Sequence, residues 1–186
     1  MERNPFPIVM RSAAALTTVG FLGLTAWHLS LPHPHVLTGA ITFGTTAYHF
    51  LMRLAVGWMV PKATRYDFDY RSAWFRPRAW EAAFYRKLRV RSWKGKLPTY
   101  APGQFSLADN TLYRVIQNTC GAELVHEIIM LFSFLPLLLV PVFGEFPVFF
   151  TTSLVSTLFD GVFVIAQRYN RPRLVRIFEK QEAKRP

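Results

Sequence analysis

Glu123 and His126 are three residues apart in an apolar stretch that we expect to form a membrane-spanning helix. At this spacing two side chains lie on one face of a helix and can touch. A carboxylate beside an imidazole fixes its tautomer and raises its basicity, which is what a general base requires. We therefore interpret His126 as a catalytic base and Glu123 as the group that orients it. The alternative is that both residues pair structurally with Arg53 and only compensate buried charge.

The string QRYNRPRL at residues 167–174 follows the last long apolar segment. Its arginines are typical of a membrane exit, where cationic residues anchor a spanning helix on the cytoplasmic side. Its amide and phenol groups add donors and acceptors that an anchor does not require. Because arginine binds oxyanions through paired hydrogen bonds, we expect the string to bind a phosphate-bearing donor or a lipid head group. The residues assigned to this role are Gln167, Arg168, Tyr169, Asn170, Arg171 and Arg173, with Trp93, Lys94 and Lys96 upstream.

Several ionisable residues lie inside the apolar segments, where charge is costly and such residues are functional candidates by default. At a rise of about 1.5 Å per residue, three of them lie roughly 9–10 Å from the cytoplasmic end of their own segment. We therefore expect a single polar layer at one depth of the membrane. The residues assigned to it, besides Glu123 and His126, are Arg53, Asp160 and Glu127, with His49 nearby on the same segment as Arg53.

Composition indicates a membrane protein. The 186 residues are 51% hydrophobic, yet the formal net charge is +11. A soluble domain rarely combines these properties, and no nucleic-acid recognition motif accompanies the positive charge. The single cysteine, Cys120, excludes an internal disulfide. His28, His33 and His35 surround a proline-flanked turn, but this spacing is only a weak metal signal, and we expect no metal site.

The apolar segments predict an all-α integral membrane protein with four transmembrane helices. Each is about as long as the ~20 residues that a helix needs to cross a bilayer. The first could instead be a signal peptide, but it is long for one and shows no convincing cleavage site. Pro61 is expected to end the second helix and Pro172 to block continuation of the fourth, leaving Arg171 extended. We expect a single membrane domain over residues 1–186, with spans at about 8–31, 36–60, 121–143 and 148–166.

The positive charges favour one orientation of these helices. The segment from Lys62 to Thr119 holds twelve Lys and Arg residues against four acids. Cytoplasmic loops carry such an excess. In the four-span arrangement, the loop 61–120 and the tail 167–186 both lie in the cytoplasm, together with both termini. We therefore expect a multi-pass protein of the cell membrane.

Within the loop, Pro77 to Arg91 has the pattern of a basic amphipathic helix. Trp80, Phe84 and Leu88 recur every fourth residue, while most of the arginines lie on other faces. A basic helix with an aromatic stripe is typical of the membrane–water interface. A soluble helix packed on its own domain is the alternative. Trp74 and Trp93 could serve as interfacial anchors on either side.

Three segments resemble the glycosyl-4,4'-diaponeurosporenoate acyltransferases, small membrane proteins of staphyloxanthin-type carotenoid synthesis. They are FY…WKGKLP at residues 84–98, AELVH at residues 122–126, and QRYNRPRL. The resemblance implies transfer of an acyl chain to a sugar hydroxyl of a glycosylated carotenoid, and the family has the same Glu and His pair. The chain departs from the family at Glu127, where the family usually has Trp, at Gly121 in place of Arg, and at Asp160 in place of Asn.

We accordingly expect a membrane acyltransferase that acts on a glycosylated carotenoid or a related glycolipid. Acyl-CoA or an acyl carrier protein would be the co-substrate, with no cofactor bound. Its partners would be membrane lipids, the lipid-linked acceptor and the acyl donor, and not nucleic acid; the oligomeric state stays open. The alternatives are a non-catalytic lipid-binding or assembly membrane protein, and another small membrane transferase or reductase that uses a nucleotide cofactor.

Overall fold

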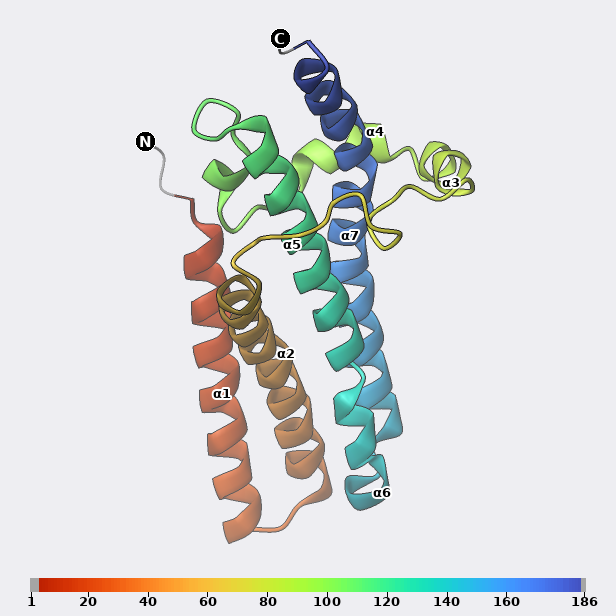
Figure 1. The fold of residues 1–186 in the computed structure, drawn as a ribbon. Helices are drawn as coiled ribbons and strands as arrows, with labels where there is room; N and C mark the ends of the chain where they lie inside the picture. Colours follow the sequence, from red (N-terminus) through yellow and green to blue (C-terminus); the bar gives the residue numbers. More distant parts are fainter. Residues whose placement is uncertain (1–3, 185–186) are drawn as a thin grey trace. The chain divides into compact units, whose positions relative to one another are not determined.

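The structure is a computed structural model that describes residues 4–184, so the outermost residues of the expected N-terminal lead and C-terminal tail lie outside it. The described chain consists of helices, turns and loops, with no strand (Figure 1). The fold class predicted from the sequence, all-α, is confirmed. The helices are α1 (Phe6–Ser30), α2 (Pro34–Thr64), α3 (Glu81–Lys87), α4 (Val90–Trp93), α5 (Leu112–Phe132), α6 (Val140–Phe143) and α7 (Phe146–Glu182), with 3₁₀ turns η1 (Lys94–Lys96), η2 (Pro102–Phe105) and η3 (Leu135–Leu139).

Among residues 4–184, three helical segments are long and apolar enough to cross a membrane: Phe6–Ser30, Leu112–Phe143 and Phe146–Glu182. They overlap three of the four predicted spans. Many of their apolar side chains are exposed; Leu29, for example, is 77% exposed and Leu138 is 73% exposed. Such surfaces are unfavourable in water and match a hydrocarbon environment. The protein is therefore a multi-pass membrane protein.

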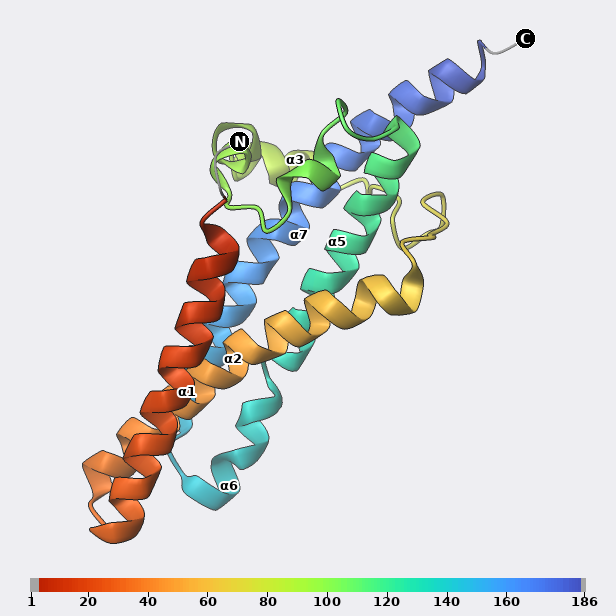
Figure 2. The ribbon, with the colours of Figure 1, turned by 90° about the vertical axis from the view of Figure 1, so that its left-hand side faces the viewer.

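The chain divides into two compact units. Unit 1 comprises Met1–Gly57 and Ile128–Asp160. In it, α1 and α2 are joined by a short connection at residues 31–33 (Figure 1, Figure 2). The two helices pack closely because glycine on each makes room for an aromatic ring on the other. A Cβ atom on Gly20 would lie 2.4 Å from the ring of Phe43, and one on Gly44 would lie 2.7 Å from Phe21. Small residues at helix contacts are the usual means of close approach in membranes.

Unit 2 comprises Trp58–Glu127 and Gly161–Pro186 and contains the long polar section. Amide side chains of α5 fix this section to the helix. The backbone N–H of Phe68 donates to Gln117 Oε1 at 2.8 Å, and Gln117 Nε2 donates back to the Phe68 carbonyl at 2.9 Å. Asn118 Nδ2 donates to the carbonyl of Gln104 at 2.6 Å. Because these amides are buried, their hydrogen bonds must be made within the protein, and the loop is held in place.

Two predictions about prolines are wrong. α2 continues past Pro61 to Thr64, and α7 continues past Pro172 to Glu182. A proline inside a helix removes one backbone hydrogen bond and costs about 3 kcal/mol. In α7 the helical register places Arg168 and Arg171 on one face, where both form buried ion pairs with Glu123. Both arginines precede Pro172. Beyond it, the Phe178 ring contacts Tyr70 and Tyr113, with ring centroids 6.3 and 5.7 Å apart, and these contacts would be lost if the helix stopped at the proline.

The single helix predicted over Pro77 to Arg91 is also wrong in its extent. The structure has the short helix α3 and, after a break, α4. Arg89 separates them with a φ of 50°, in the left-handed region that an L-residue adopts only at a cost. The aromatic stripe itself is present, because Trp80, Phe84 and Leu88 are all exposed. The buried residues of α3 are Glu81 and Tyr85, on its other side.

Candidate active site

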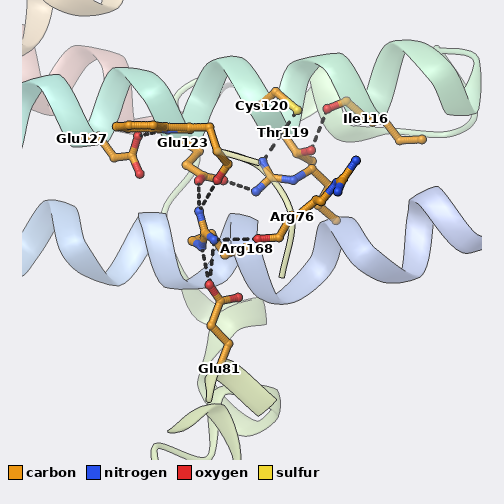
Figure 3. A network of polar contacts seen from close by, with 10 residues as sticks. Arg76, Glu81, Ile116, Thr119, Cys120, Glu123, Glu127 and Arg168 are labelled. Atoms are coloured by element: carbon orange, nitrogen blue, oxygen red, sulfur yellow. Dashed lines mark hydrogen bonds and ion pairs between the residues drawn. The ribbon is translucent and has the colours of Figure 1, made fainter. Parts of the chain in front are cut away.

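Arg168 is the centre of a buried ionic network in unit 2 (Figure 3). Its Nε and Nη2 atoms donate to Glu81 Oε1 at 2.9 and 2.7 Å, and Nη1 donates to Glu123 Oε1 at 2.6 Å. The remaining N–H groups donate to the backbone carbonyls of Trp74 at 3.0 Å and Arg76 at 3.1 Å. A guanidinium has five N–H donors, so Arg168 is fully satisfied inside the protein.

Glu123 is completely buried and contacts two arginines. While Oε1 accepts from Arg168, Oε2 accepts from Arg171 Nη2. Arg171 is itself 2% exposed, lies over the Phe75 ring at 4.9 Å, and directs Nη1 toward Cys120 Sγ at 3.7 Å. Two arginines are thus balanced by the carboxylates of Glu81 and Glu123, which allows all four charges to be buried together.

Features of the local sequence explain the positions of these four charged side chains. Arg168 and Arg171 are three residues apart on α7 and therefore share a face. Glu81 opens α3, where a carboxylate is favoured by the helix dipole. Glu123 lies in the middle of α5, in a stretch that is buried at Cys120 and Gly121 as well. Three separate elements therefore contribute to one network.

His126 lies one turn after Glu123 on α5 and is half-buried. Its ring stacks on Phe163 of α7, with the ring centroids 4.7 Å apart and the planes 9° from parallel. The neighbouring Glu127 accepts a hydrogen bond from Trp74 Nε1 at 2.9 Å. Because both Glu123 oxygens contact guanidinium groups, the role of Glu123 in orienting His126 stays a prediction.

The predicted polar layer is divided between the two units. In unit 1, Arg53 Nη2 forms an ion pair with Asp160 Oδ2 at 2.5 Å and donates to Ser156 Oγ at 2.8 Å. Ser156 Oγ in turn lies 2.6 Å from Ser133 Oγ. His49, one turn before Arg53, is also buried. Arg53 is therefore paired with Asp160 of its own unit, whereas Glu123, His126 and Glu127 belong to unit 2.

The rest of the QRYNRPRL string contacts the loop near Lys94. Lys94 Nζ donates to Asn170 Oδ1 and lies over the Tyr169 ring, 5.0 Å from its centroid. The Tyr169 ring also contacts Tyr85, with centroids 5.8 Å apart. The structure thus brings Lys94 together with Tyr169 and Asn170, and their role in donor binding stays a prediction. Of the other assigned residues, Gln167 is half-buried, Arg173 and Lys96 are exposed, and Trp93 Nε1 donates to the Leu88 carbonyl at 2.9 Å.

A cleft of about 1170 Å³ lies beside this string, entirely within unit 2. Its wall includes Arg168 and Tyr169 of α7, and Glu81 and Tyr85 of α3. Most of its other polar side chains are arginines, namely Arg78, Arg86, Arg89, Arg91 and Arg176. A concave surface with this much positive charge can bind an anionic ligand of substantial size.

The family model for glycosyl-4,4'-diaponeurosporenoate acyltransferase matches residues 71–180 of the chain. The chain belongs to this family. No curated protein and no solved structure matches the chain. The matched range includes the whole ionic network, His126 and all the residues that line the cleft. The protein is therefore a membrane acyltransferase, and the resemblance found in the three sequence segments is confirmed.

At three positions the chain differs from the acyltransferase pattern, and each residue present has a defined contact. Gly121 leaves room for the Tyr66 ring, since a Cβ atom there would lie 1.8 Å from Tyr66 Cε1. Glu127 accepts the Trp74 hydrogen bond, and Asp160 pairs with Arg53. Each of these three residues is therefore accommodated in the packing of the protein.

Two parts of the acyltransferase site were missed by reasoning from the sequence. One is Glu81, for which a signal existed: it is the one acid between Pro77 and Arg91. The other is the set of cleft arginines, of which Arg78, Arg86 and Arg89 were assigned only to the other faces of a basic interfacial helix. A like-charged cluster on a short segment has the same sequence pattern whether it faces solvent or lines a cleft, so only the structure distinguishes these cases.

Two side chains near the cleft, both outside the membrane-spanning segments, have shifted pKa values. Burial raises the pKa of the Tyr85 phenol, and the Glu81 carboxylate raises it further. Burial lowers the pKa of Lys94, and the charges of Arg173 and Arg91 add to this effect. The smaller, electrostatic part of the second shift comes from neighbouring positive charges, which also attract anions to this part of the acyltransferase.

Proposed function

We propose that this acyltransferase moves a fatty acyl group from a thioester donor to a hydroxyl of a glycosylated carotenoid or a related glycolipid. The observation that carries the proposal is the extent of the family match. Residues 71–180 contain the buried network of unit 2, His126 and the arginine-lined cleft. The acceptor class comes from the family, and the protein would draw its acceptor from the membrane and its donor from the cytoplasm.

In the proposed reaction His126 acts as the general base. The imidazole takes the proton of the acceptor hydroxyl as the hydroxyl oxygen attacks the thioester carbonyl carbon. A carbon–oxygen bond forms, the carbon–sulfur bond breaks, and the proton passes to the departing thiolate. Stacking on Phe163 at 4.7 Å limits rotation of the His126 ring and would hold it in one plane. Transfer then leaves the imidazole neutral and ready for the next cycle.

The ionic network would position this base rather than react. Glu123 lies one turn before His126 on α5, and its carboxylate is tied to Arg168 and Arg171 of α7. Phe163, the stacking partner of His126, is on α7 as well. The same two helices therefore hold both the network and the base. The buried ion pairs fix how α5 and α7 are aligned with each other. This alignment keeps His126 in the position that acid–base catalysis requires.

We further propose that α2 forms a fourth span and that both termini lie in the cytoplasm. α2 has 31 residues, about 46 Å at 1.5 Å per residue, which is ample to cross a bilayer. With four spans, the basic segments around Lys94 and Arg176 lie on the same side. On that side the exposed Trp80, Phe84 and Leu88 of the α3 region would lie at the membrane interface.

Cysteine labelling tests this topology. After the buried Cys120 is replaced by serine, single cysteines are introduced for Lys94, Arg176 and His33. In intact cells a membrane-impermeant maleimide is expected to label position 33 only, and positions 94 and 176 should react only after the membrane is permeabilised. Labelling of position 94 from outside would contradict the four-span arrangement, because it would put the basic loop on the wrong side.

The reaction is tested with purified protein in lipid nanodiscs that contain a glycosylated carotenoid, incubated with an acyl thioester. Mass spectrometry of the extracted lipids is expected to show the acceptor with one added acyl ester, in amounts that rise with time and enzyme. A parallel comparison of lipids from cells with and without the protein identifies the native acceptor. If no lipid gains an acyl group in either experiment, the proposed function is wrong.

A further inference from the structure

The cleft of unit 2 carries an uncompensated positive charge. Glu81 is the one acid among the described residues that line it, and its carboxylate is ion-paired with Arg168. Arg168 is in turn balanced by Glu81 and Glu123. The charge that remains for a ligand comes from five further arginines, all exposed: Arg78, Arg86, Arg89, Arg91 and Arg176.

The guanidinium groups of these five arginines favour phosphate as the ligand of the cleft. A guanidinium binds phosphate through two parallel hydrogen bonds, and arginine is favoured wherever planar, bidentate recognition of phosphate is needed. Five such groups around one cleft exceed what a single carboxylate would use. Burial lowers the pKa of Lys94 and the charges of Arg173 and Arg91 lower it further, so Lys94 and Arg173 lie close enough to the cleft to add to its attraction for a polyanion.

The cleft also has surfaces for an organic group. The aromatic ring of Tyr85 is buried at its wall, and Val90 and Pro172 add apolar contact. Its volume of about 1170 Å³ lies just above the range of roughly 300–1,000 Å³ for small-molecule sites. An inorganic phosphate ion would occupy only a small part of it, whereas a nucleotide with several phosphates would occupy much more.

We infer that this cleft binds the phosphate-bearing nucleotide part of the acyl donor, which makes the donor a coenzyme A thioester. The inference rests on the proposed acyl transfer. The cleft shares Arg168 with the network that positions α5, so the bound donor would lie against the side of the protein that holds the base. A carrier protein would instead dock on an outer surface and would not require a cleft of nucleotide size.

Binding of unacylated coenzyme A tests the inference without any turnover. Purified protein in nanodiscs of uncharged phosphatidylcholine is titrated with coenzyme A by calorimetry. The double variant R86Q/R89Q is expected to bind about tenfold more weakly or worse, since each charge-assisted contact contributes enough to change affinity by this factor. The control variant K180Q/K184Q removes the same charge from exposed sites at and just beyond the C-terminal end of α7 and should bind normally.

Two further arms identify the source of the phosphate. 3'-Dephospho-coenzyme A should bind more weakly than coenzyme A if several phosphates contact the arginines. In nanodiscs with phosphatidylglycerol, the affinity for coenzyme A should fall only modestly; complete loss would show that a lipid head group occupies the cleft and would overturn the inference.

If the protein does not bind coenzyme A but acylates the acceptor from a carrier-protein thioester, the inference is wrong and the proposed function stands. If coenzyme A binds and no acyl transfer occurs with any donor, the proposed function fails instead.

Discussion

Replacement of His126 by alanine is expected to lower the turnover number by about 10²–10⁴-fold, the loss typical of removing a general base. The physical reason is that the acceptor hydroxyl then has no group to take its proton as the new bond forms. Initial rates of acyl transfer in nanodiscs measure the effect. The acceptor concentration for half-maximal rate should change little, because His126 acts on the proton and not on acceptor affinity.

The control for this prediction is His35→Ala, which removes an exposed histidine from the connection region of unit 1. It should be as active as the unaltered protein. A folded, monodisperse His126→Ala protein with normal turnover would show that another group is the base.

Replacement of Glu123 by alanine is expected to destabilise the protein by about 3–5 kcal/mol, the cost of breaking a buried ion pair by removing one partner. The loss leaves Arg171, which is 2% exposed, without its carboxylate, and it removes one of the two acids that balance Arg168. Arg171→Gln should cost a similar amount because it leaves Glu123 with one partner fewer. Thermal unfolding of the purified protein, followed by loss of helical circular dichroism, measures both.

Arg173→Gln is the matched control for Arg171→Gln, because Arg173 is two residues away on the same helix and is exposed. It should unfold at the normal temperature. The double variant Glu123→Leu with Arg171→Met removes both buried charges of one pair and should be more stable than Glu123→Ala alone. If Glu123→Ala and Arg171→Gln unfold normally and only lose activity, the network is part of the reaction site and not a structural clamp.

Much of the fold could be predicted from the sequence because membrane helices are specified locally. The apolar runs within Phe6–Ser30, Leu112–Phe143 and Phe146–Glu182 are each long enough to cross a bilayer, and all three appear as helices. Their ends were predicted less well. Helices α2 and α7 pass through Pro61 and Pro172, because the local preference of proline was outweighed by tertiary contacts that the sequence does not display.

The family could also be predicted from the sequence, because the three motifs lie within the matched range of residues 71–180. The types of residue at the site followed from the motifs as well. An acid, an imidazole and several arginines in fixed order indicate acid–base and oxyanion chemistry wherever they meet. The sequence alone therefore determined that the protein is a helical membrane acyltransferase, and the roles of Glu123, His126 and the arginines stay predictions.

Only the tertiary structure decided how these charges are paired. From the sequence, Glu123 was expected to pair with His126 or Arg53; in the structure its carboxylate binds Arg168 and Arg171, which follow it by 45 and 48 residues. Likewise, the arginines between Arg78 and Arg91 line a cleft together with Arg176. The physical reason is that a buried charge is stabilised by whichever opposite charge the packing brings within hydrogen-bond distance. Sequence spacing within a single helix says nothing about a partner on another helix.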